Sequence, residues 1–128
     1  MTKTELEAIY RDYIACLNEQ DWEVLRRFVH DDVRHNDRPL GVEGYRAMLE
    51  KDYEQIPDLH FNVEILIADP PRLACRLRFD VTPEADFLGL PVHGRRVSFC
   101  EHVFYEFQDG RIRKVWSVID KAAIEVQL

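Results

Sequence analysis

The sequence has no basic stretch and no long apolar run, and each absence excludes a class of protein. Its 128 residues carry 24 acidic and 17 basic side chains, for a net charge of −7. This balance argues against a nucleic acid or an anionic membrane as partner. No apolar run approaches the roughly 20 residues that a membrane-spanning helix needs. Residues 1–13 carry acids where a signal peptide would have its apolar core, so we expect a cytoplasmic protein.

Cysteine is scarce as well, with three residues far apart in the chain: Cys16, Cys75 and Cys100. Because their number is odd and each lies in an apolar pattern, we interpret them as reduced thiols of a core. The histidines show no spacing typical of helical or hairpin metal ligands, so we expect no metal site. The length suits one domain, residues 1–128, with enough hydrophobic residues (46%) for a sizeable core.

Apolar periodicity predicts three helices in the N-terminal half. The first has a buried stripe from Leu6 to Leu17, a short second helix follows Asp21, and the third ends before Pro57. Strict alternation then predicts strands over residues 61–67 and 73–81, with a brief earlier strand over residues 33–36. Helices followed by long strands indicate an α+β fold, in which the helices cover one face of a strongly curved, mostly antiparallel sheet.

A hairpin over residues 97–120 is the strongest local signal. Asp109-Gly110 separates two β-prone runs, and Asp-Gly is favoured in two-residue hairpin loops because both positions need a positive φ. A regular hairpin of this kind pairs Val103 with Trp116 and Phe99 with Asp120. Its first face then carries Phe99, Glu101, Val103, Tyr105, Phe107, Ile112, Lys114, Trp116, Val118 and Asp120. Its second face carries Ser98, Cys100, His102, Phe104, Glu106, Arg113, Val115, Ser117 and Ile119.

Four short motifs, together with the order of the elements, connect the chain to a known family. They are Ile56-Pro57-Asp58-Leu59, Gly89-Leu90-Pro91, Asp109-Gly110-Arg111-Ile112, and Trp116 followed by Asp120. With these motifs the whole chain resembles the SnoaL-like polyketide cyclases (predicted ester cyclases) of the NTF2-like superfamily. One departure is residues 80–89, DVTPEADFLG, where many members have a GTHxG segment, so substrate contacts there are not carried over.

The resemblance implies an NTF2-like cone, in which three helices close an apolar pocket on the concave side of the sheet. It also implies cofactor-free and metal-free chemistry on a small hydrophobic carbonyl compound, namely ring closure by intramolecular aldol condensation. The acid/base of that reaction is a carboxylate near the C-terminal end of the chain, which here is Asp120. A homodimer through the outer face of the sheet is implied in the same way.

Asp120 is therefore our first candidate for the catalytic acid/base. In the regular hairpin it lies beside Trp116 and Phe99, where lost hydration would raise the pKa of its carboxyl group. We expect Asp120→Asn to fold normally and to lose activity. The alternative is a structural role, with Asp120 capping the turn at Lys121-Ala122.

Glu101, Tyr105 and His35 are the candidate partners of that acid. Glu101 lies diagonally across the hairpin and could divide acid and base roles with Asp120, or pair with Lys114. Tyr105 could donate its phenol to an oxyanion or belong to the core, and His35 could relay protons or lie on the surface. The expected substrate contacts are Trp116, Phe99, Val103, Tyr53, Leu88 and His102, the last only if a bulge turns it inward.

The leading functional hypothesis is thus a polyketide-cyclase-type enzyme. The alternatives are an isomerase or dehydratase similar to ketosteroid isomerase, which needs the same base, and a non-catalytic small-molecule-binding module. We expect the dimer to use a mixed apolar and charged outer face, made of Phe104, Val115, Ile119, Cys100, His102, Glu106 and Arg113.

Overall fold

The computed structural model describes all residues from 1 to 128 and contains a six-stranded sheet with helices on one side. The helices are α1 (Lys3–Glu19), a 3₁₀ helix η1 (Trp22–Arg27), α2 (Gly41–Gln55) and a short α3 (Lys121–Glu125). The strands are β1 (Val29–His35), β2 (Arg38–Pro39), β3 (Asn62–Asp69), β4 (Arg72–Val81), β5 (Val97–Gln108) and β6 (Arg111–Ile119).

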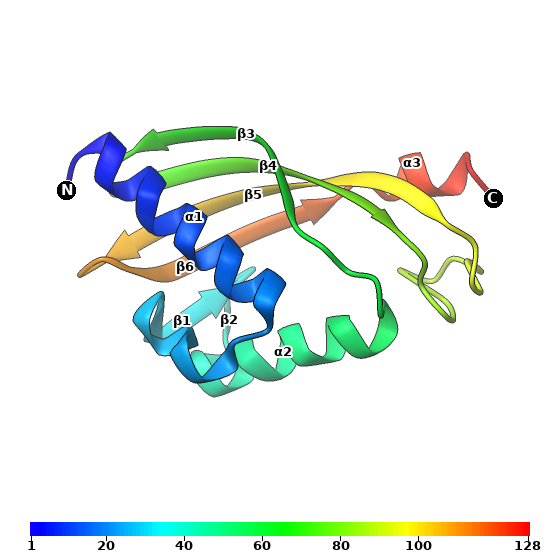
Figure 1. Ribbon diagram of the computed structural model, residues 1–128, viewed down its shortest axis with the longest axis horizontal. Helices are drawn as coiled ribbons and strands as arrows, with labels where there is room; N and C mark the ends of the chain where they lie inside the picture. The colour runs from blue at the N-terminus through cyan, green and yellow to red at the C-terminus, as the bar shows by residue number, and fades with distance from the viewer.

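The strands lie in the order β2-β1-β6-β5-β4-β3, and only the β1–β6 pair is parallel. Figure 1 shows α1 and α2 on one side of the long strands β3 to β6, whose other face is left uncovered. The predicted α+β architecture, with a curved and mostly antiparallel sheet, is confirmed. The predicted short second helix is the 3₁₀ helix η1, and the expected C-terminal tail contains α3.

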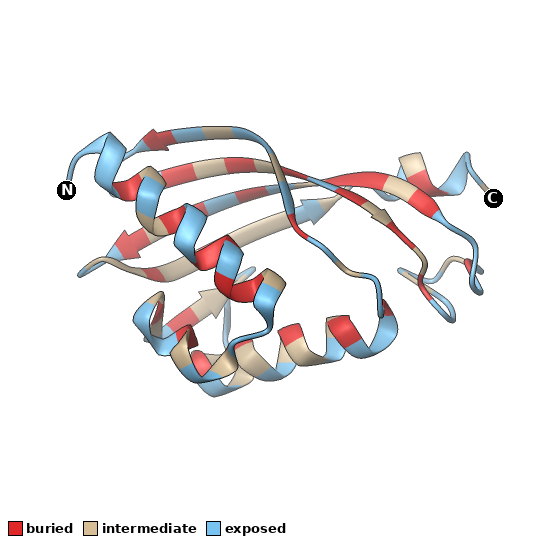
Figure 2. Ribbon diagram, viewed as in Figure 1, coloured by how far each residue is buried: buried red, intermediate tan, exposed pale blue.

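The core lies between the helices and the concave face of the sheet, as the buried positions in Figure 2 show. Helix α1 begins where the Thr2 hydroxyl accepts a hydrogen bond from the Glu5 amide at 3.1 Å. Its predicted stripe is buried, with Leu6 and Tyr10 fully inaccessible to solvent. Helix α2 ends before Pro57, as predicted. None of the helices combines the length and the apolar composition that crossing a membrane requires.

The β5–β6 hairpin contains a bulge that the sequence did not predict. Phe107 pairs with Ile112 as expected, but Glu106 pairs with Lys114, so Arg113 is an extra residue on β6. A one-residue shift moves every later side chain of a strand to the opposite face. As a result Trp116 pairs with Phe104 on the outer face, and the predicted pairing of Trp116 with Val103 is wrong.

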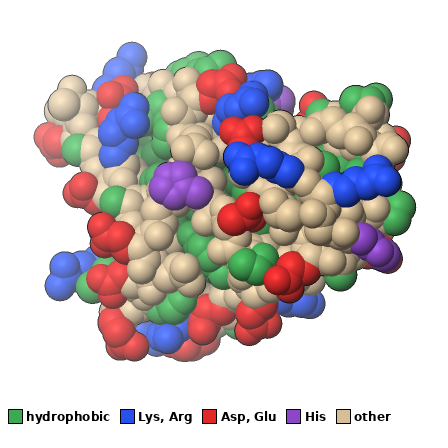
Figure 3. Space-filling view, turned by 45° about the vertical axis from the view of Figure 1, so that its right-hand side comes forward, with side chains coloured by type: hydrophobic (Ala, Val, Ile, Leu, Met, Phe, Trp, Pro, Cys, Tyr) green, Lys and Arg blue, Asp and Glu red, His purple; other side chains and the backbone are tan.

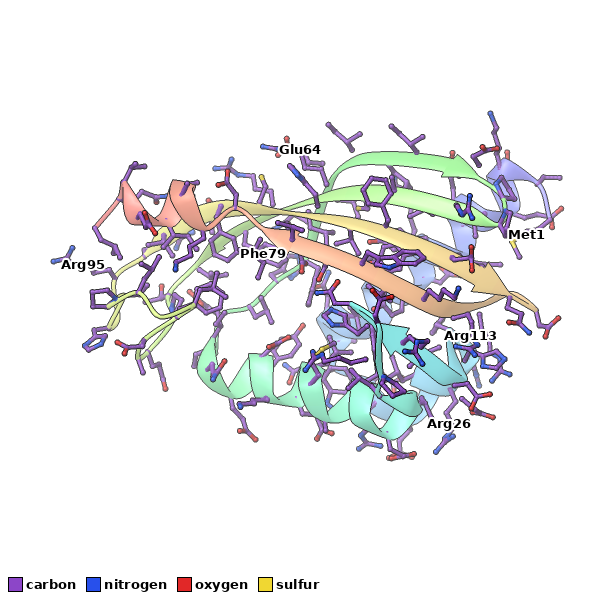
Figure 4. All side chains as sticks on the ribbon, turned by 180° about the vertical axis from the view of Figure 1, so that it is seen from behind. Met1, Arg26, Glu64, Phe79, Arg95 and Arg113 are labelled. Atoms are coloured by element: carbon purple, nitrogen blue, oxygen red, sulfur yellow. The ribbon has the colours of Figure 1, made fainter.

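Strand β1 on the other side of β6 gives a physical reason for the bulge. The Ile112 amide donates to the Phe28 carbonyl at 2.7 Å, and the Arg113 guanidinium donates to the Asp32 carbonyl of β1. In Figure 4 Arg113 lies near the edge where β6 meets β1. These contacts fix the start of β6 against β1. The extra residue on β6 then allows the same strand to pair with β5 on its other side.

The outer face therefore differs from its prediction along β6, where Val115, Ser117 and Ile119 leave it and Trp116 joins it. Val115 and Ile119 point to the concave side, so their expected place in a dimer interface is wrong. Phe104 and His102 are exposed on the outer face, as expected. The side of the molecule drawn in Figure 3 mixes acidic, basic and hydrophobic side chains, and acidic ones gather along its lower edge.

Candidate functional site

A cavity of about 530 Å³ lies between the concave face of the sheet and helices α1 and α2. Twelve of its 18 lining residues are hydrophobic, so the space suits an organic molecule with a mainly apolar body. The lining residues are Tyr13, Leu17, His35, Asn36, Tyr45, Met48, Leu49, Asp52, Phe61, Leu77, Leu88, Glu101, Val103, Tyr105, Val115, Ser117, Ile119 and Lys121.

Glu101 projects into this cavity from the middle of β5. The pKa of its carboxyl group is raised from 4.5 to about 7, mainly by burial and also by the nearby Asp52 charge, while a hydrogen bond from the Ser117 hydroxyl acts in the opposite direction. None of the ion pairs in the structure involves Glu101. A carboxyl group in this position exchanges a proton near neutral pH, which is what a general acid or base requires.

Asp52 reaches the same cavity from α2, and sequence reasoning missed it. The pKa of its carboxyl group is raised from 3.8 to about 6, because the effect of burial exceeds the opposing effect of the Lys51 charge. The signal was present in the sequence, because Asp52 stands in helical register with the buried residues Tyr45, Leu49 and Ile56. An acid within an apolar helical stripe indicates a carboxyl group that faces the interior.

Ser117 and its neighbours on β1 form the polar wall of the cavity. The Ser117 amide donates to the Asn36 side-chain oxygen at 2.8 Å, and the Asn36 amide group donates back to the Ser117 carbonyl at 3.2 Å. This pair of bonds extends the β1–β6 ladder by one residue and fixes the Ser117 backbone. The Ser117 hydroxyl lies 3.1 Å from Nε2 of His35.

The hydrogen bonds around His35 assign its tautomer. Arg38 donates to Nδ1 at 3.5 Å, so we assign the proton of the neutral ring to Nε2, which then donates to Ser117. Burial, together with the Arg38 charge, lowers the pKa of the His35 imidazole, which keeps the ring neutral. The result is a chain of donors from His35 through the Ser117 hydroxyl to the Glu101 carboxylate.

Tyrosine hydroxyls provide further donors in the cavity. Tyr13 and Tyr45 lie 2.8 Å apart, oxygen to oxygen, and Tyr105 lies 3.0 Å from Tyr10. Burial raises the pKa of all four phenols, so they stay protonated at neutral pH. In the Tyr13–Tyr45 pair only one hydroxyl can donate to the other, which leaves one O–H for a guest molecule.

Five of the ten predicted site residues meet in this cavity: Glu101, His35, Tyr105, Val103 and Leu88. Two others are buried nearby without lining it. Phe99 packs on Phe79 with ring centroids 5.3 Å apart, and the Tyr53 hydroxyl donates to the Leu17 carbonyl at 2.6 Å.

The remaining three, Asp120, Trp116 and His102, lie outside the cavity. Asp120 is exposed and caps α3 by accepting a hydrogen bond from the Ala123 amide at 3.2 Å, which was the alternative reading of the sequence. Trp116 pairs with Phe104 on the outer face, and His102 contacts Arg76 there. The expected placement of Asp120 between Trp116 and Phe99 is wrong because the Arg113 bulge shifts β6 by one residue.

The structure holds no group of three or more His, Cys, Asp or Glu side chains that could bind a metal ion. The polar groups that line the cavity are carboxyl groups, an imidazole, hydroxyl groups, an amide group and an ammonium group. Ser117 was missed as a lining residue for the same reason that Trp116 was misplaced, since a regular hairpin puts Ser117 on the outer face.

Comparison with known proteins agrees with the fold and the family. A SnoaL-like polyketide cyclase from Agrobacterium tumefaciens strain C58 is 56% identical, with a TM-score of 0.95 over 99% of this chain and 98% of the other. TsrD from Streptomyces laurentii (23% identity, TM-score 0.85, 99% and 96% covered) and IdmH from Streptomyces antibioticus (20%, 0.81, 95% and 96%) share the fold.

No match was found among curated proteins. The family model for the SnoaL-like polyketide cyclases, in contrast, matches residues 7–128, nearly the whole chain. With the close relative from Agrobacterium tumefaciens, this match shows that the chain belongs to the SnoaL-like polyketide cyclase family.

Proposed function

We propose that the protein catalyses cofactor-free acid/base chemistry on a neutral, hydrophobic carbonyl compound, of the intramolecular aldol type. The observation that carries this proposal is the Glu101 carboxyl group, which has no ion-pair partner in a largely apolar cavity and a pKa of about 7. Enzymes favour such a value because it combines basicity with the correct protonation state at neutral pH.

Glu101 takes the place that the sequence suggested for Asp120. In the proposed reaction its carboxylate removes a proton from the carbon next to a carbonyl group. The resulting enolate carbon attacks a second carbonyl carbon of the same molecule and forms the new ring bond. Protonated Glu101 then returns its proton to the alkoxide oxygen, so neither a cofactor nor a net proton is consumed.

The developing enolate oxygen needs a hydrogen-bond donor. The free O–H of the Tyr13–Tyr45 pair can serve, because both residues line the cavity and both phenols are neutral. The chain from His35 through Ser117 stabilises the charged form of Glu101 and orients it. Tyr105 is buried at the cavity wall and extends the set of donors.

The charges in the cavity favour a neutral substrate. Two carboxyl groups, Glu101 and Asp52, face the space, and Lys121 is the only Lys or Arg side chain among the lining residues. An anionic substrate would meet repulsion from both acids. A double-bond isomerisation would use the same base but return the proton to carbon, so the structure of the product distinguishes it from ring closure.

The test is exchange of α protons for deuterium on a neutral bicyclic ketone, 2-tetralone, followed by proton NMR in D₂O. Wild-type protein should accelerate exchange, and Glu101→Gln should lower the rate by roughly 100-fold or more. Asp120→Asn is the matched control, because Asn caps a helix as well as Asp does, and it should exchange at nearly the wild-type rate. Equal rates for wild type and Glu101→Gln would refute the role of Glu101.

We also propose that the protein forms a homodimer through the outer face of the sheet. One transverse row across this face is apolar: Ile67, Ala74, Phe104 and Trp116 pair in turn from β3 to β6. Phe104 and Ile67 are 61% and 62% exposed. Monomeric proteins rarely leave so contiguous an apolar patch in water.

Charged pairs border this row. Glu106 pairs with Arg72 at 3.2 Å and with Lys114 at 3.6 Å, and Glu64 pairs with Arg76 at 3.0 Å. In Figure 4 Glu64 lies on the side of the sheet away from the helices. An apolar centre with a self-neutralised charged border is typical of a two-fold interface between identical chains.

Light scattering tests the dimer with the double substitution Ile67→Glu and Phe104→Arg, which should give the mass of one chain. The control is Val126→Glu, a change at a side chain that is 86% exposed beyond α3, and it should leave the dimer intact. A double variant with an undiminished particle mass would place the interface elsewhere or show a monomer throughout.

A further inference from the structure

A second cavity, of about 70 Å³, adjoins the main one on the far side of the two carboxyl groups. Four residues line both spaces: Asp52, Phe61, Glu101 and Ile119. The remaining walls of the small cavity are Ile56, Leu59, Phe79, Phe87 and Phe99. The acids therefore stand where a large cavity and a small one meet.

Four of the nine residues that line the small cavity are phenylalanines. Phe79 stacks on Phe99 with centroids 5.3 Å apart, Phe61 meets Phe79 edge-on at 5.3 Å, and Phe87 lies 5.6 Å from Phe99. Figure 4 shows Phe79 on the helix side of the sheet. These contacts join the segment before β3, the strands β4 and β5 and the loop over residues 82–96 into one aromatic enclosure.

The loop closes this enclosure with a tight turn. Phe87 and Leu90 exchange two backbone hydrogen bonds, each 2.9 Å long. The two residues between them have positive φ angles, of 53° at Leu88 and 76° at Gly89. The turn directs Phe87 inward against Phe99, while Leu88 lines the main cavity.

The lining of the small cavity decides which chemical group it fits. It contains no Lys, Arg or His and no hydroxyl group, so an anion would lose hydration without compensation. A cation would pair with Glu101 and Asp52 and reduce the basicity on which the proposed reaction depends. A neutral alkyl group would bury apolar surface against the rings and leave the carboxyl groups as they are.

Its volume limits the size of that group. A cavity of about 150 Å³ lined by Leu, Ile and Phe holds benzene, and the small cavity has about half that volume. It therefore suits a chain of about two or three carbons.

We propose that the small aromatic cavity is a specificity subsite, which takes a short neutral alkyl chain attached to the carbon that Glu101 deprotonates. The bulky body of the substrate occupies the main cavity, its reacting carbon lies between them, and the chain enters the space enclosed by Phe79, Phe87 and Phe99. This inference rests on the proposed function for the identity of the reacting carbon, but the binding subsite itself can be tested without catalysis.

The experiment measures calorimetric affinities for a series of 2-naphthyl alkyl ketones whose alkyl group lengthens from methyl to hexyl. Each added carbon should tighten binding to wild type by roughly fourfold until the propyl or butyl ketone, and longer chains should give no further gain. Leu59→Phe fills the small cavity and should abolish this dependence on chain length. Met48→Phe, at a residue that lines only the main cavity, should weaken every ketone while preserving the dependence.

Phe87→Ala provides an independent test, because Phe87 is a half-buried loop residue whose truncation enlarges the enclosure. In this variant the alkyl length at which the affinity stops increasing should be longer than in wild type. The proposal would be overturned if the affinity of wild type did not change with alkyl chain length. It would also be overturned if the Leu59→Phe variant showed the same change of affinity with chain length as wild type. Neither result bears on deuterium exchange in Glu101→Gln, so failure of the subsite and failure of the proposed chemistry are distinguishable.

Discussion

The Glu101 carboxyl group should make the protein less stable as the pH rises through neutrality. Its pKa is about 7 in the folded state, against 4.5 as the ordinary value. The folded state therefore binds more protons than the unfolded state between these values, and the free energy of unfolding falls as pH increases. The loss in the free energy of unfolding begins above pH 4.5 and is complete above pH 7.

The magnitude follows from linkage. Between pH 5 and pH 8, a pKa that rises from 4.5 to about 7 on folding costs about 2 to 3 kcal/mol of stability. Glu101→Gln keeps the shape of the side chain and removes its ionisation. At pH 8 the variant should be about 3 kcal/mol more stable than wild type, and at pH 5 the difference should be below about 1 kcal/mol.

Neighbouring groups determine how the assay is designed. Asp52 also has a raised pKa and acts in the same direction, whereas the lowered pKa of His35 acts in the opposite direction below pH 6.5. Comparison of the variant with wild type at each pH removes these contributions to first order. Urea unfolding at pH 5 and pH 8, monitored by tryptophan fluorescence, measures both free energies. A variant that is less stable than wild type at pH 8 would refute the burial of an unpaired Glu101 carboxylate.

Two other substitutions should move the midpoint of the pH–rate profile for deuterium exchange in opposite directions. Asp52→Asn removes a negative charge beside Glu101, so the midpoint should fall below that of wild type. Ser117→Ala removes the hydroxyl that stabilises the Glu101 carboxylate, so the midpoint should rise. An unchanged midpoint in either variant, measured by NMR across pH 5 to 9, would remove that residue from the site.

Regular periodicity made the fold predictable from the sequence. The apolar stripe of α1 and the alternating apolar residues of β4 are buried as predicted. Each pattern repeats over many residues, so one misassigned residue does not change which face of the element is buried. The resemblance supplied the arrangement of these elements, and residues 7–128 match the family. Glu101, His35 and Tyr105 fall in the cavity because β5 and β1 keep the faces that their patterns indicate.

The site was harder to predict because it depends on single residues. Asp52 has the spacing of a buried helix position, but polar residues within a helical stripe are conventionally assigned to solvent. Asn36, with a φ of 47°, supplies the side chain that fixes Ser117. Pairings of this kind join segments more than 80 residues apart, and no local pattern encodes them.

The bulge at Arg113 determines which side chains of the hairpin line the cavity beside Glu101. In a regular hairpin Trp116 would fill the cavity near Glu101, and Ser117 would face outward. With the extra residue, the smaller side chains Val115 and Ser117 line the cavity instead, and Ser117 provides a donor for Glu101. The same shift sends Trp116 to the outer face beside Phe104, where it extends the apolar row of the proposed dimer. One inserted residue thus opens space in the cavity, adds a polar partner for its acid and supplies the opposite face with an aromatic ring.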